Sequence, residues 1–253
     1  MSAARGGALS NLQWLRIAGC PEITDRSIAW VFAESPSLNH LFAEQCTRIT
    51  VKSMQMVSGR MQTRDLEAFT GRARANTLPL RMMVLYDLAV GSGSITREVI
   101  TCIASFQCLR SLRLEGLVDL DDRDLLRIAG GCPLLQSLDL TGCGGPGLTH
   151  PGIAGLARLP SLTVLILTDC NISDPALTSL SQCSLLVKLS VAGSAAVTIV
   201  GILDFARQCR RLCVRDLSGC KNISPSDVPL LADRERSVQF VTAFDRSSPW
   251  DMN

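Results

Sequence analysis

A nine-residue pattern that recurs along the chain constrains its fold more than any other feature of the sequence. The pattern is L-x-x-L-x-L-x-x-C, and its clear matches are LQWLRIAGC from Leu12, LNHLFAEQC from Leu38, LQSLDLTGC from Leu135 and LTVLILTDC from Leu162. Weaker matches begin at Leu80, Leu109, Leu186 and Leu212. Successive starts lie 24 to 29 residues apart, except for one step of 42 from Leu38 to Leu80. A fixed period of this length is the signature of a repeat architecture.

A second segment follows each match and predicts a short helix. It reads, for example, ITDRSIAWV, ISDPALTSL and ISPSDVPLL. An aliphatic residue precedes Thr, Ser or Asp, which are good helix N-caps, and proline often stands in the first turn. Apolar residues then recur at helical spacing, as at Ile28, Val31 and Phe32. Stacked strand–turn–helix units bury a continuous core between a sheet and a row of helices. The sequence therefore predicts an α/β solenoid, with a parallel β-sheet on the concave face and helices on the convex face.

The pattern followed by I-T-D resembles the cysteine-containing leucine-rich repeat, which is best known from F-box substrate receptors of ubiquitin ligases. The resemblance covers residues 12–232 and implies a protein-binding fold. The segment 1–11 is too short to hold the F-box that such receptors carry, so the resemblance does not extend to ligase docking. A solenoid end without a cap leaves an exposed edge strand. We therefore expect either a fragment of a longer chain or a partner protein that covers the N-terminal end.

The step of 42 residues has two interpretations. The usual spacing places a degenerate strand at 65–69, in the sequence TRDLEAFTG, and the alternative is a surface insertion within 60–79. The predicted organisation is an N-terminal segment 1–11, a solenoid 12–243 with eight clear repeats and a closing strand at 237–243, and a tail 244–253.

The eleven cysteines are mostly periodic. One set shares the last position of the pattern and comprises Cys20, Cys46, Cys143, Cys170 and Cys220; Leu88, Leu117 and Ser194 are assigned to the same position. A second set lies three residues before a repeat start and comprises Cys132, Cys183 and Cys209, with Ser35 in the equivalent position. We interpret both sets as buried, reduced core thiols. Reduced thiols favour a cytoplasmic location, with cytoskeletal or ciliary structures included.

Enzymatic and nucleic-acid functions have little support. The formal net charge is only +2, and the charges expected on the concave face are mixed in sign. Neither His40 nor His150 is placed by the pattern beside a nucleophile and an acid. The sequence has no C-x-x-C pair, no phosphate-loop motif and no apolar run long enough for a membrane span. We predict no catalytic residue, no metal, no cofactor and no membrane insertion.

The concave face is the predicted binding surface. Strand side chains alternate, so the third, fifth and seventh positions of each pattern point away from the core. Aromatic residues make up only 4% of the chain, yet several fall on this face within its first third. Exposed aromatic clusters often mark protein contacts. The predicted protein-binding residues are Trp14, Arg16, His40, Phe42, Glu44, Phe69, Met82, Val84, Tyr86 and Arg113.

Two functions agree with these features. The first is a non-catalytic interaction scaffold that serves as a structural subunit of a larger multi-protein assembly. Repeats of the cysteine-containing type also occur in ciliary axonemal complexes, so the resemblance is compatible with an axonemal assembly. The alternative is a substrate-recognition subunit of a ubiquitin ligase. In both cases the expected partners are other proteins that cover the N-terminal end and the concave face.

Overall fold

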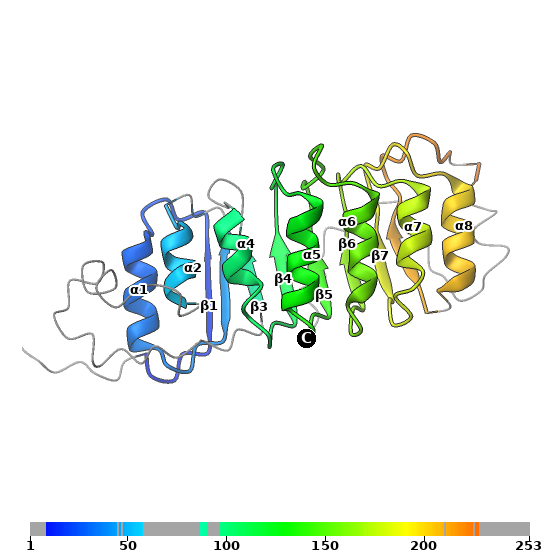
Figure 1. The fold of residues 1–253 in the computed structure, drawn as a ribbon. Helices are drawn as coiled ribbons and strands as arrows, with labels where there is room; N and C mark the ends of the chain where they lie inside the picture. Colours follow the sequence, from blue (N-terminus) through cyan, green and yellow to red (C-terminus); the bar gives the residue numbers. More distant parts are fainter. Residues whose placement is uncertain are drawn as a thin grey trace, which may run out of the picture.

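The computed structural model describes residues 9–44, 46, 48–57, 87–90, 97–209, 211–224 and 226–227. Eight parallel strands form a single sheet in the order of the sequence (Figure 1). The strands are β1 Trp14–Ala18, β2 His40–Glu44, β3 Asp87–Val90, β4 Ser111–Leu114, β5 Ser137–Asp139, β6 Val164–Ile166, β7 Lys188–Ser190 and β8 Cys213–Asp216.

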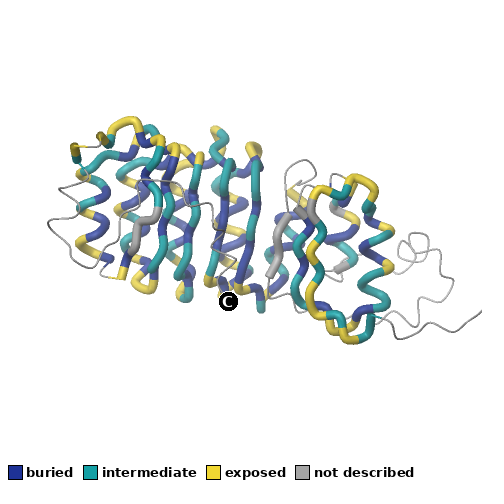
Figure 2. The backbone as a smooth tube through the Cα atoms, turned by 180° about the vertical axis from the view of Figure 1, so that it is seen from behind, coloured by how far each residue is buried: buried dark blue, intermediate teal, exposed yellow. Residues whose placement is uncertain are grey.

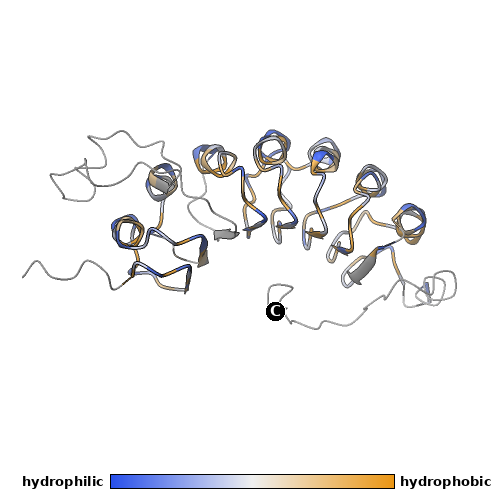
Figure 3. Cartoon of the chain, turned by 90° about the horizontal axis from the view of Figure 1, so that it is seen from below, coloured by the Kyte–Doolittle hydropathy of each residue, from blue (hydrophilic) through white to orange (hydrophobic). Residues whose placement is uncertain are grey.

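A row of helices forms the second layer. The helices are α1 Asp25–Glu34, α2 Val51–Val57, α4 Arg97–Ile103, α5 Asp122–Gly131, α6 His150–Gly155, η2 Leu156–Arg158, α7 Asp174–Leu180 and α8 Ile199–Gln208. Seen along the strands, the helices follow the outer arc and the strands the inner arc (Figure 3). This is the α/β solenoid that the repeat pattern predicts. Within the described residues, no helix combines the length and the apolar character needed to cross a bilayer.

The core lies between the two layers, where aliphatic residues at the fourth and sixth positions of the patterns pack with helix residues such as Ile128 and Phe205. As predicted, the buried residues include Leu41, Leu112, Leu114, Leu138, Leu140, Leu165, Leu167, Leu189, Val191 and Leu217. Leu15 and Ile17 were also predicted to be buried, but they are only half-buried. Their strand, β1, is the first of the sheet, and among the described strands it pairs only with β2.

The third strand lies five residues later than the sequence pattern placed it. The repeat start at Leu80 predicts a strand over 82–86, whereas β3 is Asp87–Val90, and Leu88 pairs with both Leu41 and Leu112. The segment LYDLAV matches the pattern when Leu85 takes the first position, which puts Leu88 at the fourth and Val90 at the sixth. Leu80 was therefore the wrong starting point, because an aliphatic-rich stretch offers more than one register.

The predicted strand at 65–69 falls between β2 and β3 in the sequence, in a part of the chain that the structure does not describe. These two strands pair directly with each other, with His40 opposite Asp87 and Phe42 opposite Ala89. The two interpretations of this segment, an additional strand and a surface insertion, therefore both stay predictions. Residues 58–86 themselves lie outside the described part of the chain, as do the segment 1–8, the predicted closing strand 237–243 and the tail 244–253.

The eighth strand contains an irregularity that follows from its sequence. In the pattern from Leu212, Arg215 takes the fourth position, where other repeats have leucine. In the structure Val214 pairs with Leu189 and Asp216 pairs with Ser190, so Arg215 has no register partner. A bulge of this kind places one extra residue in one of two paired strands. The prediction that Val214 lies on the concave face concerns a side chain outside the described part of the structure, and it stays a prediction.

From here, repeats are numbered by the residue at their first position. Repeats 1 to 8 begin at Leu12, Leu38, Leu85, Leu109, Leu135, Leu162, Leu186 and Leu212.

Neighbouring repeats are joined by a recurring aspartate–threonine pair. Both carboxylate oxygens of an aspartate in the first helical turn accept from the N-cap threonine of the next repeat, one from its backbone N–H and one from its hydroxyl. The three pairs are Asp25 with Thr50 (2.6 and 2.5 Å), Asp122 with Thr149 (2.7 and 2.5 Å) and Asp174 with Thr198 (2.9 and 2.6 Å). Each pair supplies a partner to an N–H at a helix start, a group that has no partner within its own helix.

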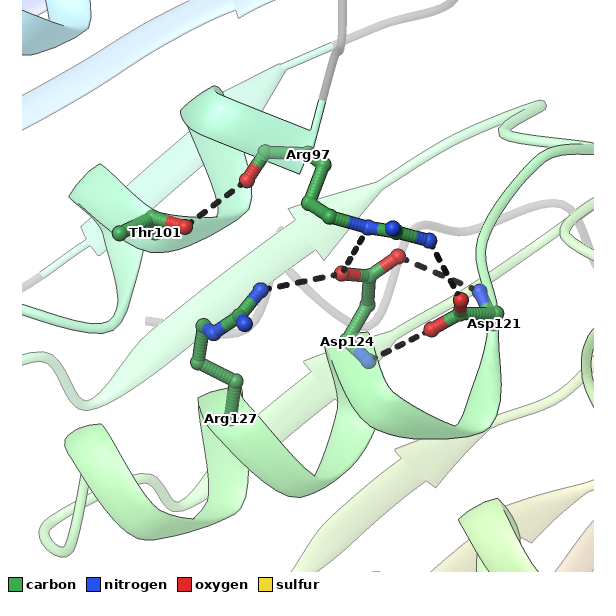
Figure 4. A network of polar contacts seen from close by, with 5 residues as sticks. All are labelled: Arg97, Thr101, Asp121, Asp124 and Arg127. Atoms are coloured by element: carbon green, nitrogen blue, oxygen red, sulfur yellow. Dashed lines mark hydrogen bonds and ion pairs between the residues drawn. The ribbon is translucent and has the colours of Figure 1, made fainter.

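Between repeats 3 and 4 the polarity of this pair is reversed. Arg97 is the first helical residue of α4, where an aspartate stands in the other pairs, and Asp121 is the N-cap of α5. Their side chains form an ion pair at 2.7 Å. Figure 4 shows Arg97 between Asp121 and Asp124, with Arg127 on the other side of Asp124. Burial raises the pKa of Asp124, and a hydrogen bond from the Asp124 backbone N–H lowers the pKa of Asp121.

The periodic cysteines also connect neighbouring repeats. The thiol at the ninth position donates to the carbonyl at the sixth position of the preceding repeat: Cys46 to Ile17, Cys143 to Leu114, Cys170 to Leu140 and Cys220 to Val191. The second set donates to carbonyls at the end of the preceding helical segment: Cys132 to Ile103, Cys183 to Leu156 and Cys209 to Ser181. All seven are buried, as predicted, whereas Cys20 in the first repeat is half-buried.

These contacts predict thiols of low reactivity. Burial raises the pKa of Cys132 and Cys170 to about 12 and that of Cys143, Cys183 and Cys209 to about 11. The thiolate is the reactive form, so at pH 8 these groups should react slowly with a disulfide reagent. We expect titration of the native protein to detect few of the eleven cysteines, and titration in denaturant to detect all of them. Stoichiometric zinc in an elemental analysis would contradict the assignment of these cysteines to the core.

Candidate protein-binding site

Three aromatic rings stack on the strand face of the first two repeats. Trp14 on β1 lies opposite His40 on β2, and Arg16 lies opposite Phe42. The Trp14 ring lies 4.2 Å from the His40 ring and 5.6 Å from the Phe42 ring, centroid to centroid, with interplanar angles of 24° and 28°. Side chains on one face of neighbouring strands are separated by roughly 5 Å, which allows such stacking. The parallel register of β1 and β2 therefore assembles the group. We call Trp14, His40 and Phe42 the aromatic platform.

The platform is accessible from the concave side. Trp14 is 57% exposed, while the His40 and Phe42 side chains are half-buried. Arg16, on the same face of β1, is exposed. Figure 2 shows this contrast along the sheet: the first repeat is largely exposed where the central strands are buried. A large, preorganised aromatic surface next to a cationic side chain has the composition typical of protein-interaction hot spots.

The structure brings together four of the ten predicted site residues: Trp14, Arg16, His40 and Phe42. Glu44 is the last residue of β2 and pairs with Ala18 on β1. Phe69, Met82, Val84 and Tyr86 lie outside the described residues. The pattern had placed Met82, Val84 and Tyr86 on the third strand of the sheet, but Asp87 and Ala89 hold those strand positions. The aromatic platform therefore consists of residues from repeats 1 and 2.

Arg113 is separate from the platform and is engaged within the sheet. It lies on β4, three strand spacings from Arg16, which corresponds to roughly 14 Å. Its Nε lies 3.3 Å from Oδ2 of Asp139 on β5, and both side chains are largely buried. Asp139 also accepts from the backbone N–H and the hydroxyl of Thr141. These internal contacts leave Arg113 little surface for a partner protein.

The C-terminal half of the concave face is less apolar. Its half-buried side chains include Val164 and Ile166 on β6, and Lys188 and Ser190 on β7. The hydroxyls of Thr168 and Ser190 hydrogen-bond each other at 3.0 Å. No ring stacking is found in this half among the described residues. The aromatic platform is therefore the feature that distinguishes the N-terminal end of the face.

One histidine does lie beside a serine, which the sequence did not predict. His150 Nε2 on α6 is 2.9 Å from the hydroxyl of Ser179 on α7, on the exposed helical side. The Ser179 hydroxyl also donates to the carbonyl of Pro175 in its own helix. A serine nucleophile requires a base that an acid orients, and no acid in the described part of the chain forms a hydrogen bond or ion pair with His150. The described residues likewise contain no group of three potential metal ligands.

Sequence reasoning missed two features of the first repeat. Trp30 on α1 is 54% exposed on the convex side. The residues of this helix that face the core include Ile28 and Ala29, which are buried. The aspartate–threonine pairs were also missed, although Asp25, Asp122 and Asp174 recur at one position of the I-T-D segment. An alignment of this aspartate position with the N-cap threonine of the next repeat would have revealed the pairs.

Comparisons with known proteins agree with this geometry. A family profile described as leucine-rich repeat matches residues 158–181. The leucine-rich-repeat-containing protein LegL7 from Legionella pneumophila is 17% identical, with 90% of this chain and 81% of that chain covered and a TM-score of 0.50. An internalin from Listeria monocytogenes is 13% identical, with 94% and 88% covered and a TM-score of 0.37. A chain of the Rad7 and Elc1 complex in yeast is 14% identical, with 97% and 80% covered and a TM-score of 0.43. The similarity to LegL7 concerns the fold alone.

Proposed function

We propose that this chain, a leucine-rich-repeat protein, is a non-catalytic protein-interaction scaffold and a structural subunit of a larger multi-protein assembly. The observation that carries the proposal is the aromatic platform of Trp14, His40 and Phe42 on the strand face. Packing of the core does not require these rings, because the core of repeats 1 and 2 is made by aliphatic side chains on the opposite side of the strands. A rigid aromatic surface loses little conformational entropy when a partner covers it.

The proposed partner is a protein rather than a nucleic acid or a membrane. Among the described residues, the exposed cation on the platform's face of β1 is Arg16, and the other basic residue assigned to the site, Arg113, is paired with Asp139. A nucleic-acid surface would need a run of basic side chains to follow the phosphates. A protein partner with an apolar segment is the better match for stacked rings beside one cation.

The proposed location is the cytoplasm, and the finer proposal is a cytoskeletal or ciliary assembly. The ten cysteines with described side chains are free thiols, and most of them are buried. Many free cysteines in one chain are typical of proteins from reducing compartments. Purification of the endogenous protein from ciliated cells, with fractionation of cilia from cell bodies, tests the finer proposal. Absence from the ciliary fraction would leave a different cytoplasmic assembly as the home of the protein.

The double substitution Trp14→Ala with Phe42→Ala tests the platform. Hot-spot aromatic residues each lose about 2 kcal/mol or more of binding free energy on truncation. We therefore expect the dissociation constant for the native partner to rise by roughly 30-fold if one of the two rings is a hot spot and by up to roughly 1000-fold if both are. The measurement is isothermal titration with the partner after it has been purified from native cells on the tagged wild-type chain and identified by mass spectrometry.

The matched control is the double substitution Val164→Ala with Ile166→Ala. These residues occupy the third and fifth positions of repeat 6 on the same sheet face and are half-buried, as Phe42 is. We expect this variant to bind the partner as the wild type does, and circular dichroism should show both variants to be folded. Unchanged affinity in a folded Trp14/Phe42 variant would move the binding site away from the platform.

A ubiquitin-ligase subunit is the second candidate. The cysteine at the ninth position, whose thiol donates to the preceding repeat, is the feature shared with the F-box receptors that the sequence resembles. Co-purification of the full chain with a cullin-type scaffold would favour this function. A partner set without ligase components would favour the structural subunit.

A further inference from the structure

The N-terminal end of the solenoid presents the same kind of surface that repeats elsewhere in the chain present to one another. Four residues define this end face: Leu15, Ile17, Cys20 and Ile23, all half-buried and packed against the core. Residues at the same four positions of the central repeats are buried: Leu138, Leu140, Cys143 and Leu148 in repeat 5, and Leu165, Leu167, Cys170 and Ile172 in repeat 6. The end face is therefore an apolar cross-section of the repeat stack.

The N-cap threonine of repeat 1 has only a weak local partner. At the three aspartate–threonine pairs, the threonine N–H and hydroxyl donate to a carboxylate of the preceding repeat over 2.5 to 2.9 Å. Thr24 occupies the equivalent position, but its N–H and hydroxyl lie 3.3 and 3.4 Å from the hydroxyl of Ser27 in its own helix. Among the described residues, these two donors therefore make only long contacts, within the capping box that Thr24 forms with Ser27.

Ser35 provides a second, independent sign of a missing neighbour. It occupies the position of Cys132, Cys183 and Cys209, each of which donates to a carbonyl at the end of the preceding helical segment. The Ser35 side chain is 0% exposed, and its hydroxyl has no hydrogen-bond partner. A buried hydroxyl without a partner is costly, so native proteins usually satisfy it.

The backbone that leads into repeat 1 forms the same turn as the backbone that leads from a helix into each of two later repeats. The Leu12 N–H donates to the Leu9 carbonyl at 3.0 Å. The same three-residue turn precedes the later repeats, as from Leu135 to Cys132 (3.1 Å) and from Leu186 to Cys183 (3.0 Å). The backbone at 9–12 thus has the geometry of a junction between two repeats.

We propose that the N-terminal end face is a stacking surface for one strand–turn–helix unit of leucine-rich-repeat type that a partner protein contributes. The first helical turn of that unit carries an aspartate that accepts from Thr24, and a carbonyl at the end of its helix accepts from Ser35. An acidic group at this place also interacts favourably with the N-terminus of α1. The inference is independent of the aromatic platform, because it concerns the end of the stack and not its concave face.

The chain itself supplies a probe for this surface. Residues 162–185 form repeat 6, which carries Asp174 and is followed directly by a first-position leucine, Leu186. We would join a copy of 162–185 to Leu12 in place of residues 1–11 and measure thermal unfolding. The expected result is a rise of the unfolding midpoint by about 4 °C or more. The matched control is the same graft with Asp174→Ala in the copy, which should lose much of the gain.

Thr24→Val and Ser35→Ala distinguish the proposed hydrogen bonds from a general stabilising effect of the graft. Thr24→Val should reduce the difference between the two grafts, since the aspartate would then accept only from the backbone N–H of residue 24. Ser35→Ala should leave the midpoint of the ungrafted chain unchanged or raise it, because the hydroxyl has no partner there. In the grafted chain the same substitution should lower the midpoint. This change of sign does not depend on the size of the graft effect.

Four outcomes would overturn the proposal. A graft that lowers the midpoint would show that the end face does not accept a repeat. A lower midpoint for Ser35→Ala in the ungrafted chain would show that the hydroxyl already has a partner. Deletion of residues 1–8 that destabilises the chain, or dimers in analytical ultracentrifugation that Thr24→Val disrupts, would assign the surface to the protein's own N-terminal segment or to a second copy.

Discussion

Replacement of Leu138 by alanine is expected to lower the free energy of unfolding by about 2–5 kcal/mol, the range found for cavities in well-packed cores. Leu138 is on β5, is fully buried and pairs with Leu112 on β4 and Leu165 on β6. A smaller side chain leaves a void between three repeats that cannot close without moving the sheet. Urea unfolding followed by circular dichroism measures the change.

Val118→Ala is the control for Leu138→Ala. Val118 is an aliphatic residue of the same region, but it is 60% exposed, so its truncation should change the stability by less than about 0.5 kcal/mol. Equal losses for the two variants would mean that position 138 does not lie in the core. A loss near zero for Leu138→Ala would contradict the register of the whole sheet, because Leu138 pairs with the fourth-position residue on each side.

Asp25→Ala is expected to cost about 3 kcal/mol. Asp25 is 8% exposed, and its carboxylate accepts from the Thr50 N–H and the Thr50 and Ser53 hydroxyls at 2.5 to 2.6 Å. Hydrogen bonds to a charged group contribute about 1.5–3 kcal/mol each, and their loss is not additive. Removal of the carboxylate leaves the donors of Thr50 and the buried Ser53 without their acceptor. The same urea experiment reports the loss.

The control for Asp25→Ala removes an aspartate from an exposed ion pair. Asp204 contacts Arg207 at 2.6 Å, and both side chains are more than half exposed. Such pairs contribute between zero and about 1 kcal/mol, so Asp204→Ala should have a small effect. If Asp25→Ala proved as mild as Asp204→Ala, the aspartate–threonine pairs would be surface contacts without importance for the stability of the stack.

The sequence predicts the architecture well because the repeat encodes it redundantly. Leucines such as Leu138 and Leu165 stand at the same position of several matching segments, so one uncertain segment does not change the fold. Prediction fails where a single repeat departs from the pattern. At the third strand, two aliphatic registers compete, and only pairing with Leu41 and Leu112 selects Leu88. At the eighth strand, Arg215 breaks the alternation, and the bulge that accommodates it depends on the neighbouring strand.

The candidate site is predictable only in part, for a related reason. Alternation along β1 and β2 correctly places Trp14 and Phe42 on the face opposite the core, and their stacking follows from the strand register. Which outward residues stay accessible depends on contacts between strands. Arg113 and Asp139 both point away from the core by their positions, yet they pair and become largely buried. Composition and periodicity do not contain that information, because it arises from side chains on different repeats.

The hydrogen bonds between repeats also have a consequence for how the chain folds. Those described above connect residues that are only 22 to 30 positions apart, as with Thr168 and Ser190 or Cys170 and Leu140. Ordering so short a loop costs little entropy, so folding can start within any pair of repeats and spread to its neighbours. The links are unequal: α6 begins with His150 where α1, α5 and α7 begin with aspartate. Native-state hydrogen exchange should therefore show separate opening units that divide between α6 and α7.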